Sequence, residues 1–305
     1  MNRTLVTVAL LLAACGPDDT PEVEVPSWAH VAPKQIAEAK KHGVTVAFEN
    51  DLGMRFVLIP AGTFLMGEAG EPAQDPDHAP LHDVTLTRSF YVSIYEVTNE
   101  QFAAYAPSHD SGSREGKPLN GPHQPVAGVT WDEARVFAGW LTGRDPQREY
   151  LLPAEAEWER ACRAGTTTRY AFGDTLSRTH AHFGASTCAD LPDGEPEPPH
   201  HSLLVGSFPA NAWGVYDMHG NVWEWCLDFL APVGTELQVD PLALHWHEEQ
   251  RGVRVVRGGS WDDGAITDFR APEYVRSAER NGRSWWHRCL DVGIRLVSPL
   301  PGPGE

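Results

Sequence analysis

The sequence predicts an α+β fold that is rich in loops, with strands and helices segregated along the chain rather than alternating. The 305 residues include 28 glycines, 25 prolines and 11 tryptophans, a composition typical of irregular structure packed around aromatic side chains. Helix signals gather between residues 98 and 165, while strand signals precede them and short strands follow. No internal repeat or change of composition divides residues 51–298, so we expect one domain there.

The first elements are a short helix and several strands. The stretch "SWAHVAPKQIAEAKKHG" predicts a helix that stops at Gly43. In "MRFVLIPAGTFLMG", two β-rich runs flank Ala61-Gly62, which predicts a hairpin. The stretch "VTLTRSFYVSIYEV" predicts one or two more strands.

Three helix starts follow. Thr98 and Thr130 each begin a capping box, T-x-x-Q and T-x-x-E, and Gly143 lies just past the expected end of the second helix. Pro153 is expected at the first position of a third helix, which Gly165 closes. Beyond residue 170 the helical periodicity fades.

The N-terminus is predicted to be a signal peptide over residues 1–14, because a basic Arg3 precedes an apolar run too short to span a bilayer. Leu12-Ala13-Ala14-Cys15 resembles a bacterial lipobox, which implies cleavage before Cys15 and lipidation of its thiol. The alternative is an ordinary signal peptide with a chance cysteine. The acidic, proline-rich segment that follows favours a lipid anchor, with residues 15–50 as a tether and short helix and residues 299–305 as a tail.

Charge and export limit the partners. The formal net charge of −18 would repel nucleic acid and anionic lipid, so we expect no nucleic-acid partner and membrane contact through the lipid anchor alone. The expected location is the bacterial cell envelope, at the outer membrane, since Gly16 and Asp18 give no strong signal for retention at the inner membrane. A protein or a carbohydrate remains as the ligand.

Export also predicts a disulfide. Four cysteines follow Cys15 and allow three pairings, among which the sequence does not choose. The helix that bears Cys162 is amphipathic, so we expect this thiol to face the core. Our preferred pair is Cys162 with Cys289. The candidates are Cys162, Cys188, Cys226 and Cys289.

An ordered set of motifs resembles a known family. The segments are "FVLIPAGTFLMG", "YEVTNEQFAAY", "PVAGVTWDEARVFAGWL", "LLPAEAEWERACRAG", "NAWGVYDMHGNVWEW", "VVRGGSW" and "DVGIRLV". Together they resemble the formylglycine-generating enzyme, or sulfatase-modifying factor, family over nearly all of residues 51–298. The resemblance implies a compact, C-type-lectin-like α+β fold that is poor in regular secondary structure.

The resemblance also identifies a catalytic corner after R-G-G-S. In formylglycine generators two cysteines, five residues apart, bind copper(I) there and oxidise a substrate cysteine. Alignment on Gly258-Gly259-Ser260 places Asp262 and Thr267 at those positions. Oxygen ligands do not hold copper(I), so copper is not expected. Asp262-Asp263-Gly264 is itself a strong turn sequence, and we expect these aspartates to cap the turn.

The resemblance further implies calcium in "DMHGNVWEW". The positional ligands are the side chains of Asp217 and Glu224, seven residues apart, and the carbonyls of Gly220 and Val222. Such hard oxygen donors suit Ca²⁺. The alternative is that Glu224 only caps a turn while the tryptophans fill the core.

Two histidine pairs offer a rival metal chemistry. His180-x-His182 and His245-x-His247, the latter beside Glu248 and Glu249, could hold iron, copper or zinc with a further ligand, although solvated loops are the commoner setting. A set of C-terminal arginines is expected to tie loops to carbonyls and carboxylates. These are Arg257, Arg270, Arg276, Arg280 and Arg295.

Three functions follow from these residues. The first is a non-catalytic surface-binding module on a lipid anchor. The second is a non-haem metal-dependent enzyme of the same superfamily, with Asp262 and Asp263 as ligands or acid–base groups. The third is a formylglycine-generating oxidase of atypical mechanism. We rank them in this order, because the fold alone does not decide function.

Overall fold

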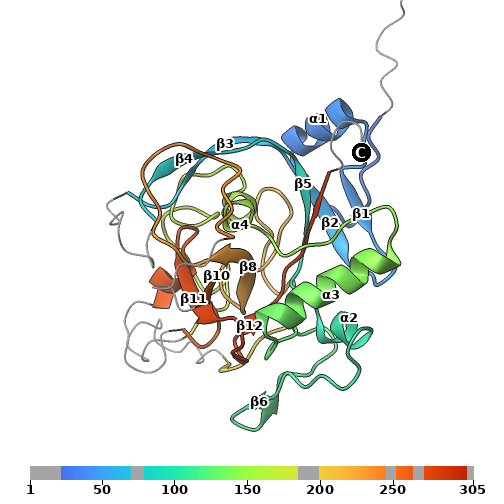
Figure 1. Cartoon of the computed structure of the whole chain (residues 1–305), viewed down its shortest axis with the longest axis vertical. Helices are drawn as coiled ribbons and strands as arrows, with labels where there is room; N and C mark the ends of the chain where they lie inside the picture. The colour runs from blue at the N-terminus through green and yellow to red at the C-terminus, as the bar shows by residue number, and fades with distance from the viewer. Residues whose placement is uncertain (1–21, 70–78, 185–198, 245–251, 264–270, 301–305) are drawn as a thin grey trace, which may run out of the picture.

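The computed structural model describes residues 22–69, 79–184, 199–244, 252–263 and 271–300 (Figure 1). Short strands, few helices and long connections confirm the predicted loop-rich α+β class. None of the helices in these ranges is long and apolar enough to cross a membrane. The helices are α1 (Pro33–His42), α2 (Asn99–Ala103), α3 (Trp131–Arg144), α4 (Glu155–Arg163) and the 3-10 helix η2 (Ala271–Val275).

Three sheets and a small ribbon surround the core. One antiparallel sheet has the order β1 (Ala47–Glu49), β2 (Arg55–Ile59), β5 (Phe90–Ser93), β13 (Val297–Pro299). A second has the order β11 (Arg280–Ser284), β10 (Val253–Arg257), β8 (Trp223–Phe229), β12 (Val292–Gly293), with β12 parallel to β8. The third joins β3 (Gly62–Met66), β4 (His82–Leu86) and β9 (Gln238–Val239), and the ribbon joins β6 (Ser113–Arg114) and β7 (Lys117–Pro118).

The predicted hairpin at Ala61-Gly62 is wrong. Strand β2 pairs with β1 and β5, whereas β3 pairs with β4 in another sheet, so the chain leaves one sheet for another at this point. Arg160 on α4 holds the corner, since its guanidinium donates to the carbonyls of Pro60 at 2.7 Å and Ala61 at 2.8 Å. Arg160 lies about a hundred residues from Pro60 and Ala61 in the sequence, so no local pattern predicts this contact.

The helix starts follow local chemistry. Both capping boxes are formed, because the hydroxyls of Thr98 and Thr130 accept from the third helical N–H and the side chain at that position reaches back. Gly43 ends α1 in the left-handed conformation, as predicted. Two ends differ: α3 runs past Gly143 to Arg144, and α4 begins two residues after Pro153.

The segment before residue 51 packs on the domain. Strand β1 pairs with β2, and the buried Gln35 of α1 donates to the carbonyls of Leu58 at 2.9 Å and Trp213 at 3.1 Å. The amide of Gln35 thus joins α1 to backbone carbonyls of two separate segments. Predictions that concern residues 1–21, including the lipidated Cys15, lie outside the described residues.

The predicted role of the arginines is confirmed. Arg257 donates to the carbonyls of Ser277 at 3.0 Å and Ala278 at 2.9 Å, and Arg280 donates to that of Ala231 at 2.8 Å. Each side chain therefore ties an irregular segment to the second sheet. Arg276 and Arg295 are also bound to carboxylates, and Arg270 lies outside the described residues.

Candidate functional site

The R-G-G-S-W corner follows β10 and is built by close backbone approach. Gly259 has φ +74°, and a Cβ there would lie 2.6 Å from the carbonyl oxygen of Tyr274. The N–H of Ser260 donates to Oδ2 of Asp263 at 2.5 Å, and the N–H of Asp262 donates to Oγ of Ser260 at 3.2 Å. Asp263 therefore caps the turn, as predicted from the turn sequence.

Asp262 is held by an ion pair. Its carboxylate forms an ion pair with Arg114 at 3.1 Å, and the Arg114 guanidinium also lies 5.7 Å from the centre of the Trp261 ring. Burial raises the pKa of Asp262 and raises that of Asp263 to about 7, and in both cases Asp291 adds to the shift. Arg114 was not predicted from the sequence, because it lies 148 residues from its partner. Thr267 lies outside the described residues.

The described cysteines are free thiols, so the preferred Cys162–Cys289 disulfide is wrong. Sγ of Cys162 lies in the core, 3.8 Å from the carbonyl oxygen of Met218 and 3.7 Å from Nε2 of His219. Burial raises the pKa of Cys162 to about 12 and also raises the pKa values of Cys226 and Cys289. These thiols are therefore protonated at neutral pH. Cys188 lies outside the described residues.

A buried acidic cluster occupies the predicted calcium segment. Glu96, Asp217 and Glu224 lie within electrostatic reach of one another and of Arg295, and all four side chains are buried. Arg295 forms a bidentate pair with Glu224, with contacts of 2.7 to 2.9 Å. Nε1 of Trp158 donates to the same carboxylate at 2.6 Å.

The charge of this cluster is unbalanced. One arginine faces three carboxylates, and within the described part of the chain no N–H group donates to the buried Oε2 of Glu96. Burial, together with the neighbouring carboxylates, raises the pKa of Glu96 well above its usual range and that of Asp217 to about 6. A hard divalent cation would suit these carboxylates by charge and hardness, but both oxygens of Glu224 already accept from Arg295.

The predicted backbone ligands Gly220 and Val222 both lie in the buried part of the domain. Gly220 is held by neighbouring segments, since its N–H donates to the carbonyl of Gly258 at 2.7 Å. Val222 is fully buried. Within the described ranges, no three histidine, cysteine or acidic side chains converge in a metal-binding arrangement. The calcium set Asp217, Gly220, Val222 and Glu224 therefore stays a prediction.

The histidine pair at residues 180 and 182 does not converge. Nδ1 of His180 lies 2.9 Å from Oγ of Ser177, and its ring stacks on Phe172. His182 is buried, its Nε2 lies 3.0 Å from the carbonyl oxygen of His201, and burial lowers its pKa to about 4. The second set, His245, His247, Glu248 and Glu249, lies outside the described residues.

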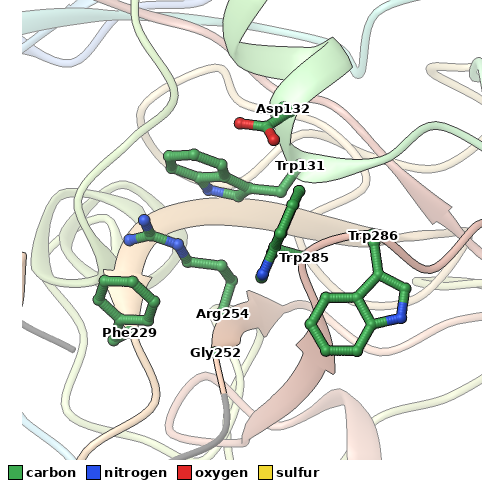
Figure 2. A pocket seen from close by; sticks show the side chains of 7 residues that line it. All are labelled: Trp131, Asp132, Phe229, Gly252, Arg254, Trp285 and Trp286. Atoms are coloured by element: carbon green, nitrogen blue, oxygen red, sulfur yellow. The ribbon is translucent and has the colours of Figure 1, made fainter. Parts of the chain in front are cut away.

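A separate cavity of about 510 Å³ lies where the start of α3 meets β10 and the turn after β11 (Figure 2). We call it the aromatic pocket. In it the Arg254 guanidinium lies between the rings of Trp131 and Phe229, and the indoles of Trp285 and Trp286 stand next to one another beside it (Figure 2). Its lining residues are Trp131, Asp132, Phe229, Gly252, Arg254, Trp285 and Trp286.

Comparison with known proteins decides the family. Residues 42–300 match the sulfatase-modifying factor enzyme 1-like domain. The chain belongs to this family. The formylglycine-generating enzyme of Streptomyces coelicolor is 32% identical over 259 residues, which cover 67% of this chain and 78% of that protein.

Two further proteins are similar to this sulfatase-modifying-factor domain. The serine/threonine-protein kinase Pkn1 of Chlamydia caviae is 34% identical over 226 residues, and the matched part covers 67% of this chain but only 32% of the kinase. The structure of PvdO from Pseudomonas aeruginosa matches with a TM-score of 0.62 and 30% identity, covering 83% of this chain and 98% of PvdO. The formylglycine-generating-enzyme fold predicted from the motifs is confirmed.

The aromatic pocket was not anticipated from the sequence of the domain. The sequence does contain the doublet Trp285-Trp286, and two adjacent tryptophans could have indicated a binding surface. Their partners Trp131 and Arg254 come from distant segments, so the pocket itself required the fold.

Proposed function

We propose that this chain is a non-catalytic binding module of the sulfatase-modifying-factor family. One observation carries the proposal: at the position where the formylglycine generators need a copper-binding thiolate, this chain has Asp262, paired with Arg114. A carboxylate engaged with a guanidinium offers neither the soft sulfur ligand nor the redox chemistry. The raised pKa values of Cys162, Cys226 and Cys289 argue that none of them replaces it.

The proposal includes display at the bacterial cell surface. The lipobox-like Leu12-Ala13-Ala14-Cys15 supports lipidation of Cys15, and the acidic segment after it supports a tether. The domain would then present its loops to a protein or carbohydrate ligand outside the membrane. Mass spectrometry of the native N-terminus tests the anchor, and a terminus other than a modified Cys15 would exclude it.

The full chain is expected not to convert the cysteine of a sulfatase-type peptide to formylglycine, with or without added copper(I). The reaction needs a copper(I)–thiolate centre, and Asp262 and Thr267 supply only oxygen. Peptide mass spectrometry measures the conversion, with a formylglycine-generating enzyme run in parallel as the positive control. Turnover above the blank without enzyme, or tight stoichiometric copper(I) binding, would contradict the proposal.

We also propose that calcium stabilises the domain at the buried acidic cluster. A ligand that binds only the folded state adds about 2.7 kcal/mol at a hundred times its dissociation constant. Calcium is therefore expected to raise the melting temperature, and a chelator to lower it. Asp217→Asn should weaken the response, because it removes one carboxylate while keeping the size of the side chain. The control is Asp51→Asn in an exposed ion pair with Arg144, which should respond as the wild type does. A melting temperature that the chelator leaves unchanged would contradict the proposal that calcium binds.

A further inference from the structure

We propose that the aromatic pocket binds a pyranose ring of a neutral carbohydrate. This inference deepens the proposed binding role by naming the class of ligand, and it rests on that role. The site is separate from the R-G-G-S-W corner and uses none of its residues.

Two exposed indoles give the pocket its first recognition feature. Trp285 and Trp286 are 40% and 51% exposed, and no other phenylalanine, tyrosine or tryptophan in the described ranges is exposed to this degree. Their ring centres are 5.4 Å apart and their planes meet at 88°, so they form two perpendicular flat walls. The C–H face of a pyranose is apolar and flat, and stacking on an indole removes both surfaces from water.

The backbone that carries Trp285 and the ring of Trp131 are fixed before any ligand arrives. The carbonyl of Trp285 accepts from the N–H of Trp131 at 3.1 Å, and Nε1 of Trp131 donates to the carbonyl of Cys226 at 2.8 Å. Gly252 lies directly against the doublet, because a Cβ there would be 3.1 Å from Cδ1 of Trp285. A preformed wall reduces the entropy that binding must lose.

An exposed carboxylate and a buried donor of the pocket match sugar hydroxyls. The Asp132 side chain is 45% exposed, and its one ion pair within the described ranges is a long contact of 3.9 Å with Arg135. Nε of Arg254 is buried at the pocket without a hydrogen-bond partner among those residues. A sugar hydroxyl both donates and accepts, so it can serve the carboxylate and the guanidinium alike.

A cationic ligand fits this pocket less well. The Arg254 guanidinium already lies 3.8 Å from the centre of the Trp131 ring and 3.4 Å from that of Phe229, and Arg135 approaches Trp131 at 5.6 Å. These faces are therefore occupied by cations, which would repel another. A wholly apolar ligand would in turn leave Nε of Arg254 without an acceptor and the carboxylate of Asp132 without a donor beyond its long contact with Arg135.

The cavity size agrees with one or two sugar rings. Its volume of about 510 Å³ falls within the range of small-molecule sites. The mixture of a few polar groups in a mainly aromatic lining is also typical of such sites.

The test is isothermal titration calorimetry of the full chain with cellotriose, maltotriose and chitotriose, and with choline as a cationic probe. At least one trisaccharide is expected to saturate. Trp285→Ala and Trp286→Ala should each weaken its affinity at least about tenfold, and Asp132→Asn should weaken it measurably. The matched control is Leu237→Ala, which removes another exposed apolar side chain, 61% exposed, away from the pocket. Melting temperatures confirm that each variant is folded, and Trp285→Phe, which keeps an aromatic face, should retain part of the affinity.

Three outcomes would overturn the inference. These are no saturation by any trisaccharide up to about 10 mM, saccharide binding that both tryptophan variants leave intact, and choline binding that Trp285→Ala abolishes. The formylglycine assay is independent of this one. Peptide turnover together with tryptophan-dependent saccharide binding would end the non-catalytic proposal and leave the pocket assignment standing.

Discussion

Glu159→Ala is expected to lower the free energy of unfolding by about 3–5 kcal/mol, because it leaves buried cations without their carboxylate. Oε1 of Glu159 accepts from Nε of Arg163 and from the N–H of Gly67, each at 2.8 Å, and Oε2 accepts from Arg257. The side chains of Glu159 and Arg257 are fully buried. Burial alone would lower the pKa of Arg257, but Glu159 and Glu155 raise it, so the cation keeps its charge and needs its partner.

Urea denaturation measures this loss, and Glu49→Ala is the matched control. Glu49 also pairs with an arginine, Arg55, at 2.7 Å, but the two side chains are 43% and 37% exposed. Exposed pairs contribute about 0–1 kcal/mol, since water screens them. A loss for Glu159→Ala no greater than that for Glu49→Ala would contradict the structural role assigned to the buried arginines.

The elements that could be predicted from the sequence are those whose cause lies within a few residues. The capping boxes at Thr98 and Thr130 and the left-handed stop at Gly43 each depend on contacts inside one helical turn. The cap that Asp263 places on the N–H of Ser260 is equally local. At these positions, the chemistry of the side chains and their short spacing were sufficient to predict the local structure.

The failures share a different cause. The hairpin expected at Ala61-Gly62 is replaced by a corner between sheets, because Arg160 binds the carbonyls of Pro60 and Ala61 from a distant helix. The disulfide expected for Cys162 is absent, and its thiol instead lies against the carbonyl of Met218 and the ring of His219. The amphipathic helix indicated that Cys162 faces the core, but the partners of both Arg160 and Cys162 come from distant segments.

The candidate sites could likewise be predicted only in part. The family motifs located the corner and the acidic segment, but the excess charge at that segment depends on Glu96, which comes from a separate stretch of chain. The same holds for Arg114 beside Asp262 and for Arg254 between Trp131 and Phe229. Glu96 and Arg295 lie in other quoted segments and Arg114 and Arg254 lie in none, so it is the fold that brings these charged residues to each site.

Gly220→Ala is expected to destabilise the protein by about 2–5 kcal/mol, the sum of a conformational cost and a steric one. Gly220 has φ +90°, and a Cβ there would lie 2.0 Å from the carbonyl oxygen of His182. That carbonyl accepts from the N–H of Asn221 at 2.6 Å, so it cannot withdraw without breaking a hydrogen bond. The substitution would therefore push apart two segments that frame the buried acidic cluster.

The control for Gly220→Ala separates the two costs. Gly53→Ala also places alanine at a positive φ, +69°, but no atom lies within 4 Å of the added Cβ. It should therefore show only the conformational cost of about 1–2 kcal/mol. The difference between the two variants in urea denaturation then measures the backbone approach at residue 220. Equal losses would mean that His182 moves freely, and the segment carrying the predicted calcium ligands Gly220 and Val222 would then be pliable rather than preformed.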